Sequence, residues 1–143
     1  MKSKNNIPNL SYYRLSLLSF LHESHPERAN DERFITARAE MAAETYAQAR
    51  LNGSNNIEAD EQANLVLFQD LYFSKHDTIV NILWNEFAGE VPEKYAKAFA
   101  LKLLPECESI FAKYPLSDDF AYDPQYDLLY TELTGTIALL IDN

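Results

Sequence analysis

Apolar residues recur along the chain at helical spacing. The first stripe consists of Leu10, Tyr13, Leu17 and Phe20 or Leu21. Because residues three and four apart share one face of an α-helix, this stripe predicts a helix that ends before Pro26. No segment keeps the alternation of apolar and polar residues that is typical of a half-buried strand. The pattern therefore predicts helices and no sheet.

Start and stop signals divide the following residues into further helices. Asn30 or Asp31 can cap a long helix over residues 31–52, and Gly53 suits the position just past its end. We predict that the next helix begins near Ile57. Its inward residues are expected to be Ala63, Val66, Leu67 and Leu71.

The second half of the chain carries similar signals. Ser74 can accept a hydrogen bond from the backbone N–H of Asp77, which predicts another helix start. Pro92 suits the first turn of the helix after that. A proline inside a helix produces a kink, so the sequence leaves open whether Pro105 bends this helix or splits it.

Together these elements predict an all-α protein, with six or seven helices in a single compact domain over residues 1–143. A chain of this length buries enough apolar surface to be stable without disulfides. The one cysteine, Cys107, fits a reducing compartment, so we predict a cytoplasmic protein. No stretch approaches the roughly 20 apolar residues of a membrane-spanning helix, and no membrane association is expected.

The acidic net charge of the chain indicates which classes of partner it can bind. The chain has 12 Lys and Arg against 22 Asp and Glu, a net charge of −10. Residues 106–143 hold eight of the acids and only Lys113 as a base. Because such a surface repels phosphates, direct binding to nucleic acid or anionic lipid is not expected. Basic proteins and cations remain as partners, and the sequence leaves open whether the chain forms a homo-oligomer.

The stretch "YPLSDDFAYDPQYDLLYTE", residues 114–132, sets four aspartates among five aromatic rings, without Lys or Arg. Most of it has a structural interpretation. Asp123 followed by Pro124 is the arrangement of a helix cap and first turn, and Asp127 then lies where the helix end favours negative charge. We expect the rings of Phe120 and Tyr122 to pin the preceding loop to the body of the protein.

The same stretch is also the best candidate for a partner surface, because tyrosine offers a large contact area and a hydroxyl group. The predicted surface consists of Asp118, Asp119, Phe120, Tyr122, Asp123, Tyr126 and Asp127. The sequence leaves open whether Tyr126 and Tyr130 face the core or an interface.

Other residues that often carry chemistry have ordinary interpretations. His22 and His25 bracket a short segment in which Pro26 disfavours the helical geometry that paired zinc ligands need, so both are predicted at the surface. Trp84 and Phe87 are predicted to pack in the core. The sequence has no phosphate-binding glycine loop, and the aspartate-rich stretch lacks the glycine of a calcium loop. No catalytic residue, cofactor or metal ligand can be named.

Cys107 lies between Glu106 and Glu108. Negative charge beside a thiol disfavours the thiolate, which is the reactive form. We therefore interpret Cys107 as a structural residue.

Four segments of the sequence carry a family resemblance: "LSYYRLSLLSFLHESHPE", "AAETYAQARLNG", "LWNEFAGEVPE" and "FAKYPLSDDFAYDPQYDLLYTELTGTIALL". They resemble a small family of domains of unknown function from Gram-negative anaerobes of the Bacteroides group, often encoded on conjugative mobile elements. The resemblance covers nearly the whole chain and implies an all-helical bacterial protein. It supplies no catalytic residue, cofactor or substrate.

Three functions follow, in order of preference. The first is a non-enzymatic helical module that binds a protein partner through its acidic, tyrosine-rich C-terminal face. The second is an acidic DNA mimic serving a mobile element, although residues 23–105 carry eight Lys or Arg that dilute such a surface. The third is a small enzyme that uses the carboxylates of residues 118–127 with a divalent metal.

Overall fold

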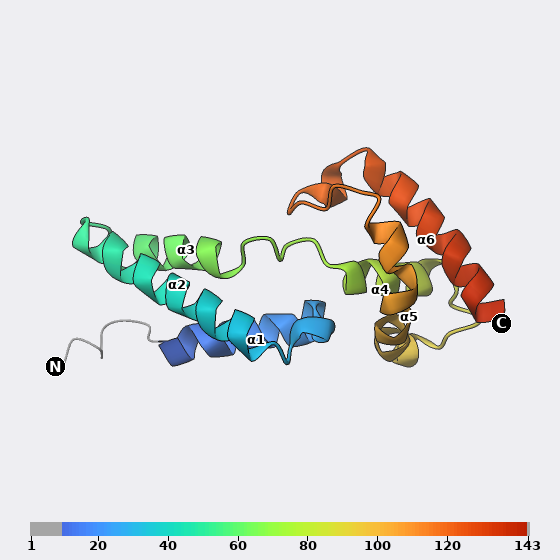
Figure 1. Cartoon of the computed structure of the whole chain (residues 1–143), viewed down its shortest axis with the longest axis horizontal. Helices are drawn as coiled ribbons and strands as arrows, with labels where there is room; N and C mark the ends of the chain where they lie inside the picture. The colour runs from blue at the N-terminus through green and yellow to red at the C-terminus, as the bar shows by residue number, and fades with distance from the viewer. Residues whose placement is uncertain (1–9, 143) are drawn as a thin grey trace. The chain divides into compact units, whose positions relative to one another are not determined.

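The computed structural model describes residues 10–142, and every α-helix in this range is connected by turns, short 3-10 helices or irregular segments (Figure 1). No strand occurs within the described residues, so the all-α prediction is confirmed. The elements in order are α1 (Leu10–Ser24), η2 (Pro26–Arg28), α2 (Glu32–Leu51), α3 (Asn56–Leu67), α4 (Lys75–Glu86), η3 (Glu93–Tyr95), α5 (Ala96–Phe111), η4 (Phe120–Tyr122) and α6 (Gln125–Asp142).

The described chain forms two compact units. The N-terminal unit comprises residues 10–23 and 27–69, and the C-terminal unit comprises residues 24–26 and 70–142. The assignment of the whole chain to a single domain stays a prediction. None of the described helices combines the length and the apolar character that crossing a membrane requires.

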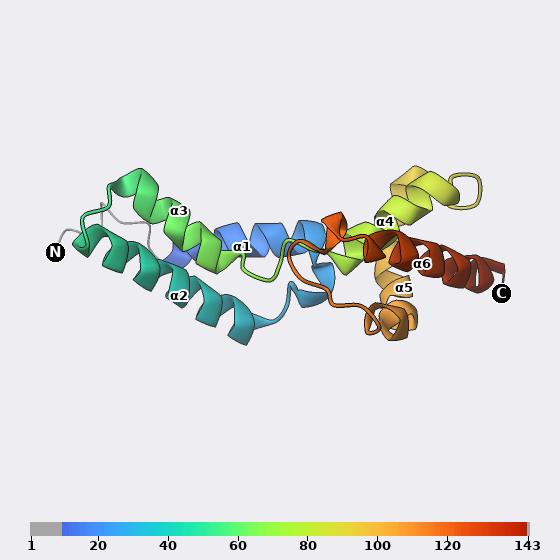
Figure 2. The same cartoon turned by 90° about the horizontal axis from the view of Figure 1, so that it is seen from above.

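The N-terminal unit is built on the hairpin of α2 and α3, which lie side by side in both views (Figures 1 and 2). Small side chains are buried on both helices, which lets their backbones approach closely. These are Ala39, Ala42 and Ala49 on α2 and Ala59 and Ala63 on α3. The helix α1 buries Tyr13, Leu17 and Leu21, as its stripe predicts, and the Tyr13 hydroxyl donates to Asp60 at 3.0 Å.

The ends of α2 and α3 follow local capping rules. Asp31 accepts a hydrogen bond from the N–H of Phe34, and Gly53 takes the left-handed conformation (φ 101°) just past α2, both as predicted. The helix α3 begins with a capping box, in which Asn55 and Glu58 each accept from the other's backbone N–H. The predicted start near Ile57 overlooked this signal.

The C-terminal unit packs α4, α5 and α6 around one apolar core. Its buried side chains include Ile79, Leu83, Leu104, Phe111, Leu129, Leu133 and Ile137. Ser74 caps α4 by accepting from the N–H of Asp77, as predicted. The helix α5 runs continuously from Ala96 to Phe111 with Pro105 inside it, so this proline does not split the helix.

Three residues outside the aspartate-rich stretch lie elsewhere than predicted. His25 is buried rather than exposed, because its Nε2–H donates to the carbonyl of Leu71 at 2.8 Å across the C-terminal unit. Leu71 itself is buried but follows α3 instead of belonging to it. Trp84 is 39% exposed rather than buried, and its indole Nε1–H donates to the carbonyl of Glu93 at 3.4 Å.

Candidate partner-binding face

Phe120 anchors the aspartate-rich stretch of the C-terminal unit. It is 1% exposed, and its ring makes edge-on contacts with Phe73, Tyr114 and Tyr126 at centroid distances of 5.4, 6.0 and 6.4 Å. Aromatic pairs prefer this edge-to-face geometry, and each contributes beyond simple burial. Phe120 pins the loop as predicted, but the same burial removes it from the predicted partner surface.

Tyr126 and Tyr130 lie at the edge of the core, which answers the question that the sequence left open. Tyr126 is half-buried against Phe73 and Phe120, and burial raises its pKa, with a further rise from the Asp127 carboxylate. The Tyr130 hydroxyl donates to Glu86 at 3.0 Å. Both rings are therefore partly buried and contribute to packing inside the unit.

Asp118 has a structural role that the sequence did not predict. Its two carboxylate oxygens accept hydrogen bonds from the backbone N–H groups of Asp70, at 2.9 Å, and Tyr72, at 3.0 Å. Asp70 has a left-handed backbone (φ 67°), a conformation that non-glycine residues adopt at a cost. Asp118 thus fixes a strained turn that lies 46 to 48 residues away in sequence.

Asp123 caps α6 as predicted. Its backbone is extended (φ −80°, ψ 142°), and its Oδ1 accepts from the N–H of Gln125 at 2.8 Å. Asp127 lies in the first turn of the helix, also as predicted, and is exposed. The carboxylates of Asp118 and Asp123 are thus already engaged by backbone N–H groups, which weakens the proposal of a metal-dependent enzyme at this place.

Tyr122 is 90% exposed, so the prediction that its ring pins the loop is wrong. A single residue, Ala121, separates it from the buried Phe120, and the tight turn of η4 directs the two rings to opposite environments. Tyr122 stands among carboxylates with exposed or half-buried side chains. We call Asp119, Tyr122, Asp123 and Asp127 the acidic turn.

A polar network secures the flank of this stretch. Both the Lys113 ammonium and the Tyr114 hydroxyl donate to the carboxylate of Glu132, the latter at 2.6 Å. These two bonds hold the pKa of Glu132 below its ordinary value, and the bond from Lys113 has the larger effect. The bond to Glu132 in turn raises the pKa of Tyr114. This network ties the end of α5 to the middle of α6.

Residues 5–143 match the family model described as a domain of unknown function, DUF1896. The chain belongs to the DUF1896 family. It is similar to a solved structure titled "Crystal structure of protein PG0816 from Porphyromonas gingivalis", with 45% sequence identity and a TM-score of 0.89. The similarity covers 93% of this chain and 91% of that one. A comparison with curated proteins found no match.

The family assignment confirms the resemblance to domains of unknown function, and the neighbour's organism fits the Bacteroides group. Neither the family description nor the neighbour's title states an activity. Within residues 10–142, no three His, Cys, Asp or Glu side chains gather in a way that could hold a metal ion.

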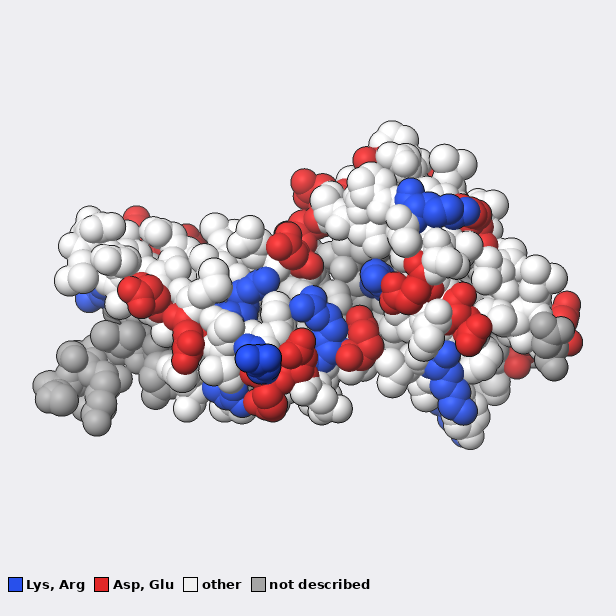
Figure 3. All heavy atoms as spheres, viewed as in Figure 1, with Lys and Arg blue, Asp and Glu red and all other residues white. Residues whose placement is uncertain are grey.

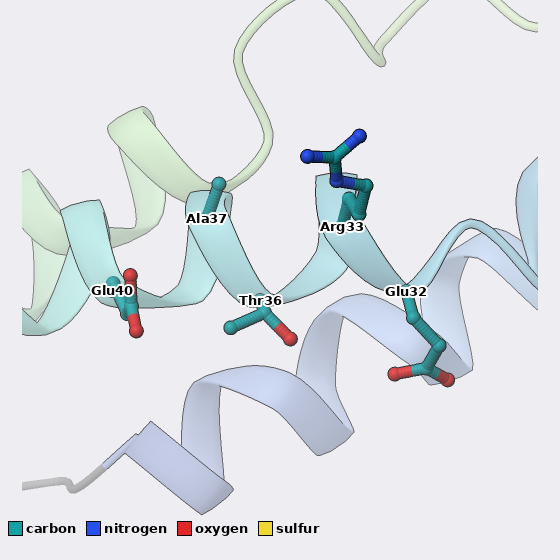
Figure 4. Close-up of a pocket in the computed structure, with 5 residues that line it drawn as sticks. All are labelled: Glu32, Arg33, Thr36, Ala37 and Glu40. Atoms are coloured by element: carbon teal, nitrogen blue, oxygen red, sulfur yellow. The ribbon is translucent and has the colours of Figure 1, made fainter.

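The DUF1896 chain also has a hollow of about 430 Å³ on the N-terminal unit, lined by five residues of α2 (Figure 4). Figure 4 shows Glu32 and Thr36 pointing toward α1 while Arg33 points away. From α1, Arg14 donates to Thr36 at 2.5 Å and to Glu32 at 3.0 Å. The hollow is a shallow groove along a single helix, and it includes none of the residues predicted for function.

Proposed function

We propose that this protein is a non-enzymatic helical module that binds a basic protein partner through the acidic turn. One observation carries the proposal. Tyr122 is 90% exposed on a turn whose neighbouring ring, Phe120, is 1% exposed and held by three aromatic contacts. A large aromatic side chain is thus presented to solvent on a fixed support.

A fixed tyrosine suits an interface for a physical reason. Ordering flexible side chains and loops on binding costs free energy, and a turn that is already ordered avoids much of that cost. Tyrosine is enriched among residues whose truncation weakens binding by at least about 2 kcal/mol. Tyr122 therefore suits the role of an anchor residue in an interface.

The charge of the C-terminal unit indicates that its partner is basic. The side chains of the C-terminal unit comprise 13 acids and 5 bases, a net charge of −8, whereas the described N-terminal unit comprises 9 acids and 5 bases, a net charge of −4. Figure 3 shows acidic side chains at the surface of this unit. Exposed carboxylates of one sign attract a basic partner and raise its association rate.

The test places a photo-crosslinking amino acid at position 122 and expresses the protein in a Bacteroides-group bacterium. Leu51, which is 80% exposed on the N-terminal unit, serves as the matched control position. We expect position 122 to capture a discrete basic protein, and we expect the double substitution Asp119→Asn and Asp127→Asn to reduce that product. Equal capture from both positions, or none from position 122, would overturn the proposal.

The same charge favours a second candidate, an acidic DNA mimic encoded on a mobile element. Such a protein occupies the DNA-binding surface of its target, so duplex DNA competes with it. Adding duplex DNA at constant ionic strength should then abolish the cross-link from position 122. A cross-link that persists under these conditions supports the simple protein-binding module instead.

A further inference from the structure

A second feature of the C-terminal unit lies apart from the acidic turn. A groove of about 460 Å³ opens between residues 90–99, which lead into the first turn of α5, and the end of α6. It is lined by Glu90, Val91, Pro92, Tyr95, Phe99, Leu140 and Ile141. Six of these seven side chains are apolar or aromatic, and none belongs to the acidic turn.

The groove is the open edge of the hydrophobic core. Val91, Phe99, Leu140 and Ile141 are partly buried and pack against the core residues of the unit. Tyr95 stands beside them with 55% of its surface exposed. Contiguous apolar surface that is open to solvent is typical of interaction sites.

The charges around the groove are mostly negative. Glu90 is the one charged residue that lines the groove, and the adjoining positions include Glu93 and Asp142, all exposed. Two bases oppose these acids: Lys97 in the first turn of α5, and Lys94, whose ammonium lies 5.2 Å from the ring centroid of Tyr95. An occupant with an apolar face and positive charge beside Glu90 therefore matches the groove best.

We propose that this groove docks an amphipathic α-helix of a partner protein, with its apolar face on Tyr95, Phe99 and Ile141 and with Lys or Arg beside Glu90. Helix-in-groove binding uses apolar residues spaced three and four apart as anchors, while flanking charges set specificity. A second copy of this chain fits the groove poorly, because it would bring another unit with a net charge of −8 against this acidic rim. The groove shares no residue with the acidic turn, so this proposal stands independently of the proposed function.

Trp84 provides a direct readout. It is the only tryptophan of the chain, is 39% exposed, and donates to the carbonyl of Glu93 two residues before Tyr95. The probes are two tryptophan-free model helices of about 18 residues, or five turns, with leucine on one face. One carries lysine on its polar face and the other carries glutamate. Each is titrated into the full chain while Trp84 emission is recorded.

We expect the lysine helix to bind and shift the Trp84 emission to shorter wavelength, and the glutamate helix not to bind. Tyr95→Ala should weaken binding of the lysine helix about tenfold, which corresponds to about 1.4 kcal/mol. Leu128→Ala is the matched control on α6, because Leu128 is 62% exposed and outside the groove. It should bind like the parent.

Glu90→Lys separates charge from shape, because Glu90 lines the groove and is exposed. This variant should bind the lysine helix more weakly and the glutamate helix more tightly. The proposal is overturned if neither helix binds the parent, if both bind equally, or if Tyr95→Ala has no effect. A concentration-dependent dimer that Tyr95→Ala disrupts would assign the groove to a second copy instead. The Tyr122→Ser variant should bind the lysine helix as tightly as the parent does, because Tyr122 does not line the groove. A failure of the groove proposal can therefore be distinguished from a failure of the proposed function.

Discussion

Asp118→Ala tests whether the turn at Asp70 depends on a distant carboxylate. The substitution removes the acceptor of two backbone N–H groups, those of Asp70 and Tyr72, at 2.9 and 3.0 Å. A hydrogen bond to a charged group contributes about 1.5–3 kcal/mol when it is buried. Because Asp118 is only half-buried and water can replace it, we take about 1 kcal/mol for each bond. The expected loss in the free energy of unfolding is about 2 kcal/mol.

Asp118→Asn should lose about half as much, since an amide offers one acceptor oxygen and turns an NH₂ group toward the second donor. The matched control is Asp119→Ala, at the exposed neighbouring residue, where a change within about 0.5 kcal/mol is expected. Urea denaturation gives the free energies, and hydrogen exchange reports directly on the amides of Asp70 and Tyr72. If these two amides exchange equally fast in Asp118→Ala and in the parent, the carboxylate does not hold the turn.

The remaining predictions concern single side chains. Asp123→Ala should cost about 1 kcal/mol in urea denaturation, whereas Asp123→Asn should keep most of the stability because its oxygen still caps α6; equal losses would argue against a capping role. Burial, with neighbouring glutamates, raises the pKa of the Cys107 thiol to about 11, so a thiol reagent at pH 8 should label it only in urea; rapid labelling of the folded protein would contradict the structure. The lowered pKa of Glu132 means that its bonds with Lys113 and Tyr114 stabilise the fold above the unfolded-state pKa, and that this contribution disappears as pH falls through the folded-state pKa. Glu132→Gln should therefore be less stable than the parent at neutral pH, and a pH series of melting temperatures that kept the same gap in acid would refute this.

The helices were largely predictable from the sequence because their signals are local. The caps at Asp31, Ser74 and Asp123 each bond to a backbone N–H two or three residues ahead, so the residues that decide them stand next to one another. The capping box of Asn55 and Glu58 was equally local and was overlooked.

The roles of the aspartate-rich stretch were harder to predict, because they depend on distant residues. Asp118 bonds to backbone groups more than 45 residues away in sequence. The burial of His25, which lies outside this stretch, was missed for the same reason, because its partner is the distant carbonyl of Leu71. The sequence also gives equal weight to Phe120 and Tyr122, two aromatic residues in one turn. Only the packing against Phe73 decides that one ring is buried and the other is exposed.

The affinity of Tyr122→Ser for the protein captured from position 122 tests the central claim most directly. Tyr122 is 90% exposed, so its removal should change the free energy of unfolding by no more than about 0.5 kcal/mol. If the pinned turn presents this ring to a partner, the dissociation constant should rise at least about tenfold. A Tyr122→Ser variant that is as stable as the parent and binds the partner equally well would contradict the account.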